Sequence, residues 1–277
     1  MFELGPVGQY RLVRAPLAQA LAQVRFPLLA KLQTFEGVAP LQDALLTDYP
    51  YMDKLAEAGF AFAVGQAAPV QSEQTTSWHF KDDDGRLLVV SSNAMTLSVG
   101  RQYSGFADFK QRFEGALAAL ITSLSPSKCL QVGIRFFNLV DDIGNDEGRW
   151  KSIFNSSIVG WPASQIIHGD TRLQSSVSQI QLASPPVNEL AEFPGDVQAV
   201  IRHGIAPAAS IAPGIPAIQL AERGFFLDID TFVTGTQEFD AKEILKQFEA
   251  MHSQADRFFL WTLTDEGREY FGLKEDH

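Results

Sequence analysis

The 277-residue chain contains a single cysteine, Cys129. One thiol excludes an intramolecular disulfide and any metal site built from several thiolates. The five histidines offer no substitute, because no two of them are three or four residues apart, the spacing at which one helix face presents two metal ligands. We therefore expect a protein without a metal or another cofactor, in a reducing compartment.

Long apolar runs are also missing. No stretch of about 18 uncharged apolar residues, roughly what a transmembrane helix needs, is present. The first residues lack the basic start and apolar run of a secretory signal. These absences predict a cytoplasmic protein with no membrane partner.

Basic residues are in deficit, with 22 Lys and Arg against 33 Asp and Glu and a net charge of −11. The basic residues are scattered singly, and the average field repels a phosphate backbone, so we expect no nucleic-acid partner. A negative surface suits a basic protein partner, although the same charge can serve only to keep the chain soluble.

Motifs for nucleotide binding, the hydrolase nucleophile elbow and the zinc-protease helix are absent as well. Catalytic triads are defined by geometry and not by local sequence, so these absences alone do not exclude an enzyme. They favour a non-catalytic protein.

The patterns that are present predict alternating groups of strands and helices. Residues 20–26 alternate as a strand does, residues 77–103 read as three antiparallel strands joined by polar turns, and residues 105–124 have helical apolar spacing. Residues 40–60, interrupted by Pro50, predict two short helices. This order indicates an α+β fold with mainly antiparallel strands.

The C-terminal part shows similar patterns. Strands are predicted over 130–140, 174–183 and 223–235, and a helix is predicted to begin after Asp240. Residues 184–224, with glycines and prolines near both ends, are predicted to be a linker.

Two segments, 96–117 and 226–251, each read as a strand, a polar loop and a helix with Phe-Glu near its middle. This similarity suggests two sheet-and-helix halves, 1–145 and 146–277, and is compatible with a distant internal duplication. The halves can form two domains or a single one.

Four polar residues are candidates for a ligand site: Arg25, Arg135, Asn138 and His252. Arg25 and Arg135 lie inside predicted strands, where a buried guanidinium requires carboxylates, carbonyls or an anionic ligand. Pairing with Asp or Glu is one interpretation, and ligand binding is the other. The second requires the four side chains to converge between helix and sheet.

His252 and two further side chains, Asp228 and Asp230, have two interpretations each. His252 shares a helical face with aromatic residues and lies four positions before Asp256, so it belongs either to a helix-on-sheet contact or to the lining of a pocket. Asp228 and Asp230 point to one side of a strand, either as a paired-carboxylate site or as the solvated face of that strand.

Several segments resemble a sporadically distributed family of uncharacterised bacterial proteins of similar length. They are PLAQALAQVRF (16–26), Trp78-x-Phe80, YSGFADFKQRFE (103–114), GIRFFN (133–138) and MHSQADRFFLWTLTDEGREYFG (251–272). The resemblance implies no established activity, and it implies an accessory, antitoxin-like or defence-associated role.

We therefore hypothesise a cytoplasmic, non-catalytic protein-binding or accessory factor, for which a homo-oligomer is possible. The alternative is a small-molecule-binding protein or an unrecognised enzyme with a pocket between helix and sheet.

Overall fold

The computed structural model describes residues 4, 8, 10–57, 75–141, 147–161, 173–185, 195–206 and 224–275. In the N-terminal part the strands are β1 (Tyr10–Leu12), β2 (Leu17–Arg25), β3 (Tyr51–Glu57), β4 (Thr75–Lys81), β5 (Leu87–Ser91), β6 (Ala94–Val99) and β7 (Lys128–Val140). The helices of this part are the short 3-10 helix η1 (Ala30–Gln33), α1 (Phe35–Leu45) and α2 (Phe106–Leu124).

The C-terminal part supplies four more strands and four helices within the described residues. The helices are α3 (Glu147–Ile153), α4 (Ser156–Val159), α5 (Ala241–Thr262) and α6 (Asp265–Phe271). The strands are β8 (Ser176–Ser184), β9 (Val197–Ala206), β10 (Gly224–Glu238) and β11 (Leu273–Glu275).

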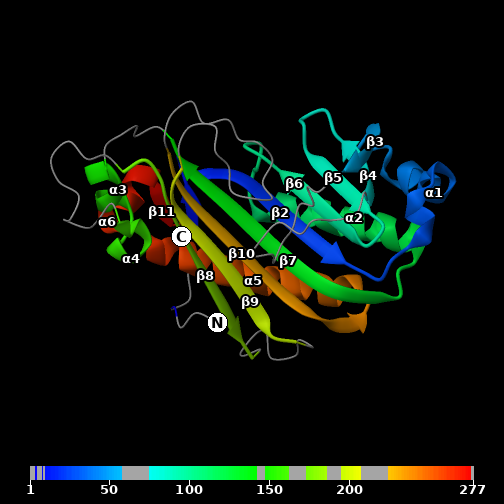
Figure 1. The fold of residues 1–277 in the computed structure, drawn as a ribbon. Coiled ribbons are helices and arrows are strands. Elements are labelled where there is room, and N and C mark those ends of the chain that lie inside the picture. The colour runs from blue at the N-terminus through cyan, green and yellow to red at the C-terminus, as the bar shows by residue number, and fades with distance from the viewer. Residues whose placement is uncertain are drawn as a thin grey trace.

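Within the described residues, nine strands form one antiparallel sheet in the order β3-β4-β5-β6-β2-β7-β10-β9-β8 (Figure 1), and β1 pairs with β11 in a second, small sheet. All the strand pairs are antiparallel. The predicted α+β class with mainly antiparallel strands is therefore confirmed.

A similar but not identical order of elements occurs twice in the described parts of the chain, and each occurrence is called a repeat. In the first repeat β2 is followed by α1, the strands β3 to β6 and α2, and in the second β7 is followed by α3 and α4, the strands β8 to β10 and α5. In each repeat the first strand pairs with the last, and β2 and β7 pair with each other at the centre of the sheet. The two halves thus join in one sheet, and β7 opens the second repeat although it precedes residue 146.

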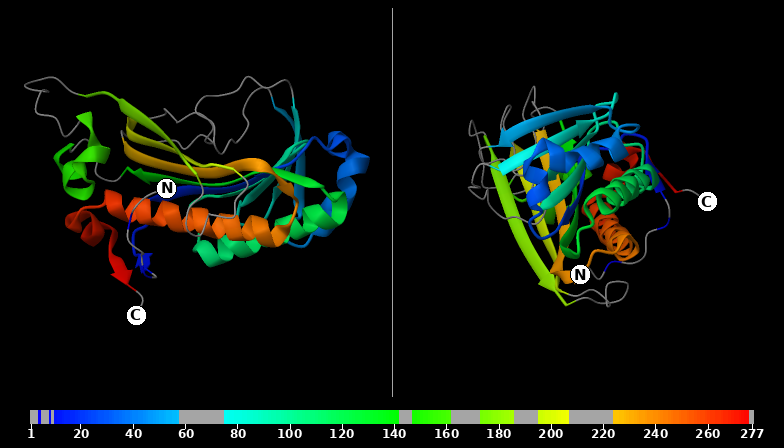
Figure 2. Two further views of the ribbon diagram at one scale, coloured as in Figure 1. Left: turned by 90° about the horizontal axis from the view of Figure 1, so that it is seen from below. Right: turned by 90° about the vertical axis from the view of Figure 1, so that its right-hand side faces the viewer.

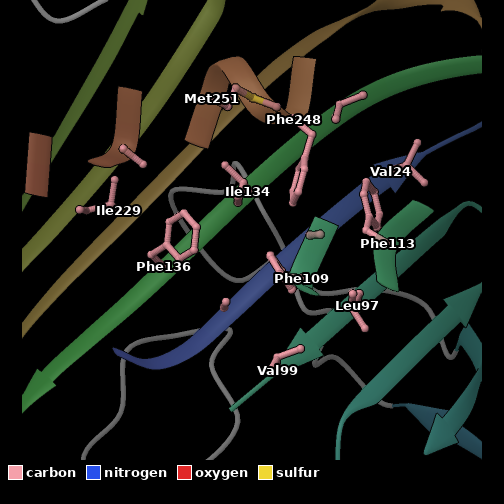
Figure 3. Packing of buried hydrophobic residues seen from close by; sticks show 14 of the residues in the cluster. Val24, Leu97, Val99, Phe109, Phe113, Ile134, Phe136, Ile229, Phe248 and Met251 are labelled. Carbon is pink, nitrogen blue, oxygen red and sulfur yellow. The ribbon is translucent and has the colours of Figure 1, made fainter. Parts of the chain in front are cut away.

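The long helices α2 and α5 lie side by side along one face of the sheet (Figure 2). Alternation along the strands turns every second side chain toward these helices, and the helical spacing of aromatic residues supplies the matching apolar surface. Figure 3 shows side chains of this core from β2, β6, β7, β10, α2 and α5: Val24, Leu97, Val99, Phe109, Phe113, Ile134, Phe136, Ile229, Phe248 and Met251. One continuous core therefore includes residues of both repeats.

Two predictions of secondary structure from the sequence are wrong. The described part of the segment, residues 40–57, does not hold two helices: one helix, α1, runs from Phe35 to Leu45, and residues 51–57 form β3. Pairing with β4 overrides the helical spacing of this segment. The predicted linker 184–224 contains β9, whose apolar centre is buried on both faces between β8 and β10.

No helix in the described ranges is both long enough and apolar enough to cross a membrane. In the same ranges no group of three or more His, Cys, Asp or Glu side chains is arranged to hold a metal ion.

Candidate functional site

A charged network lies on the sheet face opposite the helices. Arg135 sits between Ile134 and Phe136, which belong to the helix-facing core, so its guanidinium points to the other face. Its Nε and Nη2 each donate to one carboxylate oxygen of Asp228 on β10, both at 2.8 Å. From β9, Arg202 Nη1 donates to Asp228 Oδ2 at 2.9 Å. One carboxylate therefore accepts three charge-assisted hydrogen bonds from two arginines.

The network is almost completely shielded from solvent, with exposed fractions of 0% for Asp228 and Asp230, 2% for Arg135 and 5% for Arg202. Burial lowers the pKa of Arg135, but the pairing with Asp228 and the charge of Asp230 outweigh it, and the net shift is upward. Arg135 is therefore charged. Of the two interpretations of this residue, pairing with a carboxylate is the one that the structure supports.

The interpretation of Asp228 and Asp230 as a solvated face is wrong. Both side chains are buried, because the neighbouring strands bring arginines to the same face. Strand alternation predicts the shared side, but it contains no information on which strands become neighbours. The sequence prediction also did not include Arg202, which lies in the segment predicted to be a linker.

Arg25 and Arg135 share this face but do not lie together. In the pairing of β2 with β7, Arg25 stands opposite Gln131 and Arg135 stands opposite Leu21. The two arginines are thus separated by four residues along the strands, about 13 Å at the usual rise per residue.

Asn138 and His252 lie on the other side of the sheet. Asn138 stands opposite Leu227, a residue of the helix-facing core, and its side-chain amide donates to the Leu227 carbonyl at 3.2 Å. His252 projects from α5 onto Phe136 of β7. The predicted convergence of Arg25, Arg135, Asn138 and His252 is therefore not found, because the sheet separates the two arginines from the other two residues.

His252 belongs to a separate, partly exposed group of titratable side chains. Its ring stacks on Phe106 with a centroid distance of 3.6 Å, and its Nε2 lies 3.5 Å from Asp256 Oδ2. The Tyr10 hydroxyl donates to Asp256 Oδ1 at 3.2 Å. Tyr10 arrives there through the pairing of β1 with β11 at opposite ends of the chain. Only the tertiary structure reveals this contact, because 246 positions separate Tyr10 from Asp256.

Burial shifts the pKa values of this group away from their usual ranges. It lowers the pKa of His252 to about 4 and raises that of Asp256 to about 6, with the Tyr10 hydrogen bond acting in the opposite sense on Asp256. Burial, followed by the charge of Asp256, also raises the pKa values of Tyr10 and Tyr103. Near pH 7 the imidazole is neutral and the carboxyl is mostly ionised.

Replacing Asp256 with asparagine is expected to make stability fall as the pH is lowered from 6.5 toward 4. The pKa of His252 is lower in the folded state, so the unfolded chain takes up the imidazole proton first and becomes favoured. In the natural chain the raised pKa of Asp256 has the opposite effect, because that proton binds more tightly to the folded state, and the two largely cancel.

Urea unfolding between pH 4 and pH 7 measures this effect, and we expect a loss on the order of 1 to 3 kcal/mol in the Asp256→Asn variant. The double variant His252→Gln/Asp256→Asn is the control, since it lacks both groups. Identical pH profiles for the single and double variants would contradict the assignment to His252.

The last notable feature is the outer edge of β8. All nine of its residues are partly or largely exposed, with exposed fractions of 66% for Val177, 43% for Ile180 and 36% for Leu182. Within the described residues β8 pairs only with β9. The sequence SVSQIQLAS contains no charge and no proline. Such an edge offers unpaired backbone donors and acceptors to another strand.

These features define an α+β protein whose described helices cover one face of a nine-stranded antiparallel sheet, with a charged network on the other face and an uncharged edge strand. A scan against protein-family models finds no match to this chain, and a search of curated proteins finds no significant match.

Proposed function

We propose that the protein is a non-catalytic binding factor that takes up an extended polypeptide strand along the outer edge of β8. The exposure of this uncharged strand is the observation that carries the proposal. Strand addition of this kind draws affinity from main-chain hydrogen bonds and specificity from alternate side chains. Val177 and Ile180 supply apolar contacts on opposite faces of the strand.

The opposite edge of the sheet supports the choice of β8. The edge strand β3 carries Asp53, Lys54 and Glu57 among its seven residues, and Lys81 on β4 forms an ion pair with Asp53 at 2.6 Å. Charged side chains on an edge strand disfavour pairing with a further strand. Of the two edges, β8 is therefore the one that accepts a partner.

The expectations about partner charge, location and biological role rest on the sequence alone. A basic partner is predicted from the net charge of −11, and β8 adds nothing to that prediction because it is uncharged. A cytoplasmic location follows from the sequence features described above, and an antitoxin-like or defence-associated role follows from the family resemblance. These remain predictions.

The alternative function, a small-molecule-binding protein or an enzyme, has less support. Its four candidate residues are divided between the two faces of the sheet. The fully buried Asp228 carboxylate is already engaged by Arg135 and Arg202.

The proposal predicts that a partner held by the natural chain is lost when Ile180 is replaced with lysine. A charged side chain on the edge strand opposes pairing, and we expect at least a tenfold weaker association, about 1.4 kcal/mol. Each protein is purified at endogenous expression from its own host, bound polypeptides are quantified by native mass spectrometry, and cross-links to residues 176–184 are mapped.

Leu55→Lys is the matched control, because Leu55 lies on the other edge strand with an exposed fraction of 44%, close to the 43% of Ile180. This variant is expected to retain the partner. A stoichiometric partner that survives Ile180→Lys, or the absence of any bound polypeptide including a second copy of the chain, would overturn the proposal.

A further inference from the structure

We infer that the strand accepted by β8 is β8 of a second copy, running antiparallel about a two-fold axis at Ile180. This inference rests on the proposed function and names its partner. An axis through one residue places that residue opposite its own copy and places residues at equal distances on either side opposite each other. Any antiparallel strand can meet its copy in this way, so the side chains that would face each other decide whether the pairing is favourable.

The sequence of β8 is nearly symmetrical in chemical character about Ile180. The pairs created by the axis are Ile180 with Ile180, Gln179 with Gln181, Ser178 with Leu182, Val177 with Ala183 and Ser176 with Ser184. Amides thus meet amides, hydroxyls meet hydroxyls at the ends, and each larger apolar side chain meets another apolar or a small residue. Directly opposed side chains of compatible type stabilise an antiparallel pair.

One existing hydrogen bond orients the amide pairs. Gln179 Oε1 accepts from Arg202 Nε at 2.9 Å, so the amide nitrogen of Gln179 remains as the donor. The side-chain oxygen of Gln181 in the second copy is the matching acceptor. The two-fold axis forms this contact twice, on the sheet face that also carries the charged network.

On the other face the axis covers apolar surface that is exposed in the single chain. Ile180 packs against its own copy, and Leu182 lies against Ser178 of the second copy. Val177 lies on the face that carries the charged network. Covering Ile180, Leu182 and Val177 removes apolar area from water, which favours association.

The charge pattern does not oppose a second copy at this edge. Residues 173–185 contain no Asp, Glu, Lys, Arg or His, so no like charges meet when two strands pair. The net charge of −11 on each copy acts from a greater distance, where a Debye length of about 8 Å at physiological ionic strength screens it. A basic strand would find no acidic residue on β8 to pair with, which favours the self-complementary partner.

Sedimentation equilibrium of the full chain tests the inference over a concentration series. The natural chain is expected to form dimers, and Ile180→Lys and Ile180→Glu are each expected to dimerise at least about tenfold more weakly. An equimolar mixture of these two variants is expected to associate about tenfold more tightly than either alone, because lysine in one copy then lies opposite glutamate in the other. Leu55→Lys should dimerise like the natural chain.

The mixture tests the position of the axis, since only a pairing that places Ile180 opposite itself rescues in this way. A monomeric natural chain, a dimer insensitive to both Ile180 variants, or a mixture no tighter than its components would each overturn the inference. If the natural chain is monomeric but its endogenous partner still depends on Ile180, the second copy is wrong and the proposed function stands. If the natural chain is monomeric and no endogenous partner depends on Ile180, both the inference and the proposed function fail.

Discussion

Replacing Asp228 with alanine is expected to lower the free energy of unfolding by about 3 to 5 kcal/mol, because it leaves two buried guanidinium groups without their carboxylate. Arg135 and Arg202 both bond to Asp228, and neither can reach water easily, with exposed fractions of 2% and 5%. Urea unfolding followed by circular dichroism measures the change. If the variant does not accumulate in folded form, Asp228→Asn, which keeps the shape and one acceptor oxygen, should give a smaller loss.

Asp53→Ala is the control for this prediction. Asp53 also forms an ion pair, with Lys81, but more than half of the Asp53 side chain is exposed. An exposed pair of this kind contributes less than about 1 kcal/mol. Equal losses of unfolding free energy in the Asp53 and Asp228 variants would show that burial does not account for the contribution of the network to stability.

Replacing Phe248 with alanine is the second change with a large expected effect, again about 3 to 5 kcal/mol. Phe248 is fully buried on α5, and its ring contacts three aromatic residues of α2: Phe106, Phe109 and Phe113, at centroid distances of 5.4, 5.7 and 5.0 Å. Its removal leaves a cavity at the contact between the long helices of the two repeats. Urea unfolding measures the loss, and a fall in the melting temperature should accompany it.

Phe35→Ala deletes the same atoms at the surface and is the matched control. Phe35 is 59% exposed, although its ring and that of Trp78 form a T-shaped pair with a centroid distance of 4.8 Å. We expect a loss of about 1 kcal/mol or less, in the range of surface substitutions with one aromatic contact. If Phe248→Ala lowers the free energy of unfolding no more than Phe35→Ala does, the result would contradict the central place of Phe248 in the core.

The elements with strong periodic patterns were predictable from the sequence. Helix α2 and strands β7 and β10 lie close to the expected ranges, and Asp240 caps α5 by accepting hydrogen bonds from the backbone of Lys242 and Glu243. These features depend on residues within one or two turns of each other. Local spacing is therefore sufficient to predict them.

The candidate site was predicted less well, because its contacts join distant parts of the chain. Arg135 was identified as a buried arginine, but its partner Asp228 is 93 positions away and lies on a strand that becomes a neighbour only in the folded sheet. The sequence prediction does not include Arg202, because residues 184–224, which contain β9, are predicted to be a linker. The local pattern at β9 is weak, and its burial comes from the strands on either side.

The amino-acid sequence alone indicates the antiparallel α+β character, the helix after Asp240 that carries Phe248, and the symmetrical, uncharged composition of residues 176–184. Each of these properties depends on residues that are close together in the sequence, so the periods of strands and helices are sufficient to predict it. The folded structure is needed to show that β8 lies at an edge of the sheet, that Asp228 pairs with two arginines, and that Tyr10 reaches Asp256. Those outcomes depend on which strands become neighbours, and that is settled by how the whole chain buries its apolar surface.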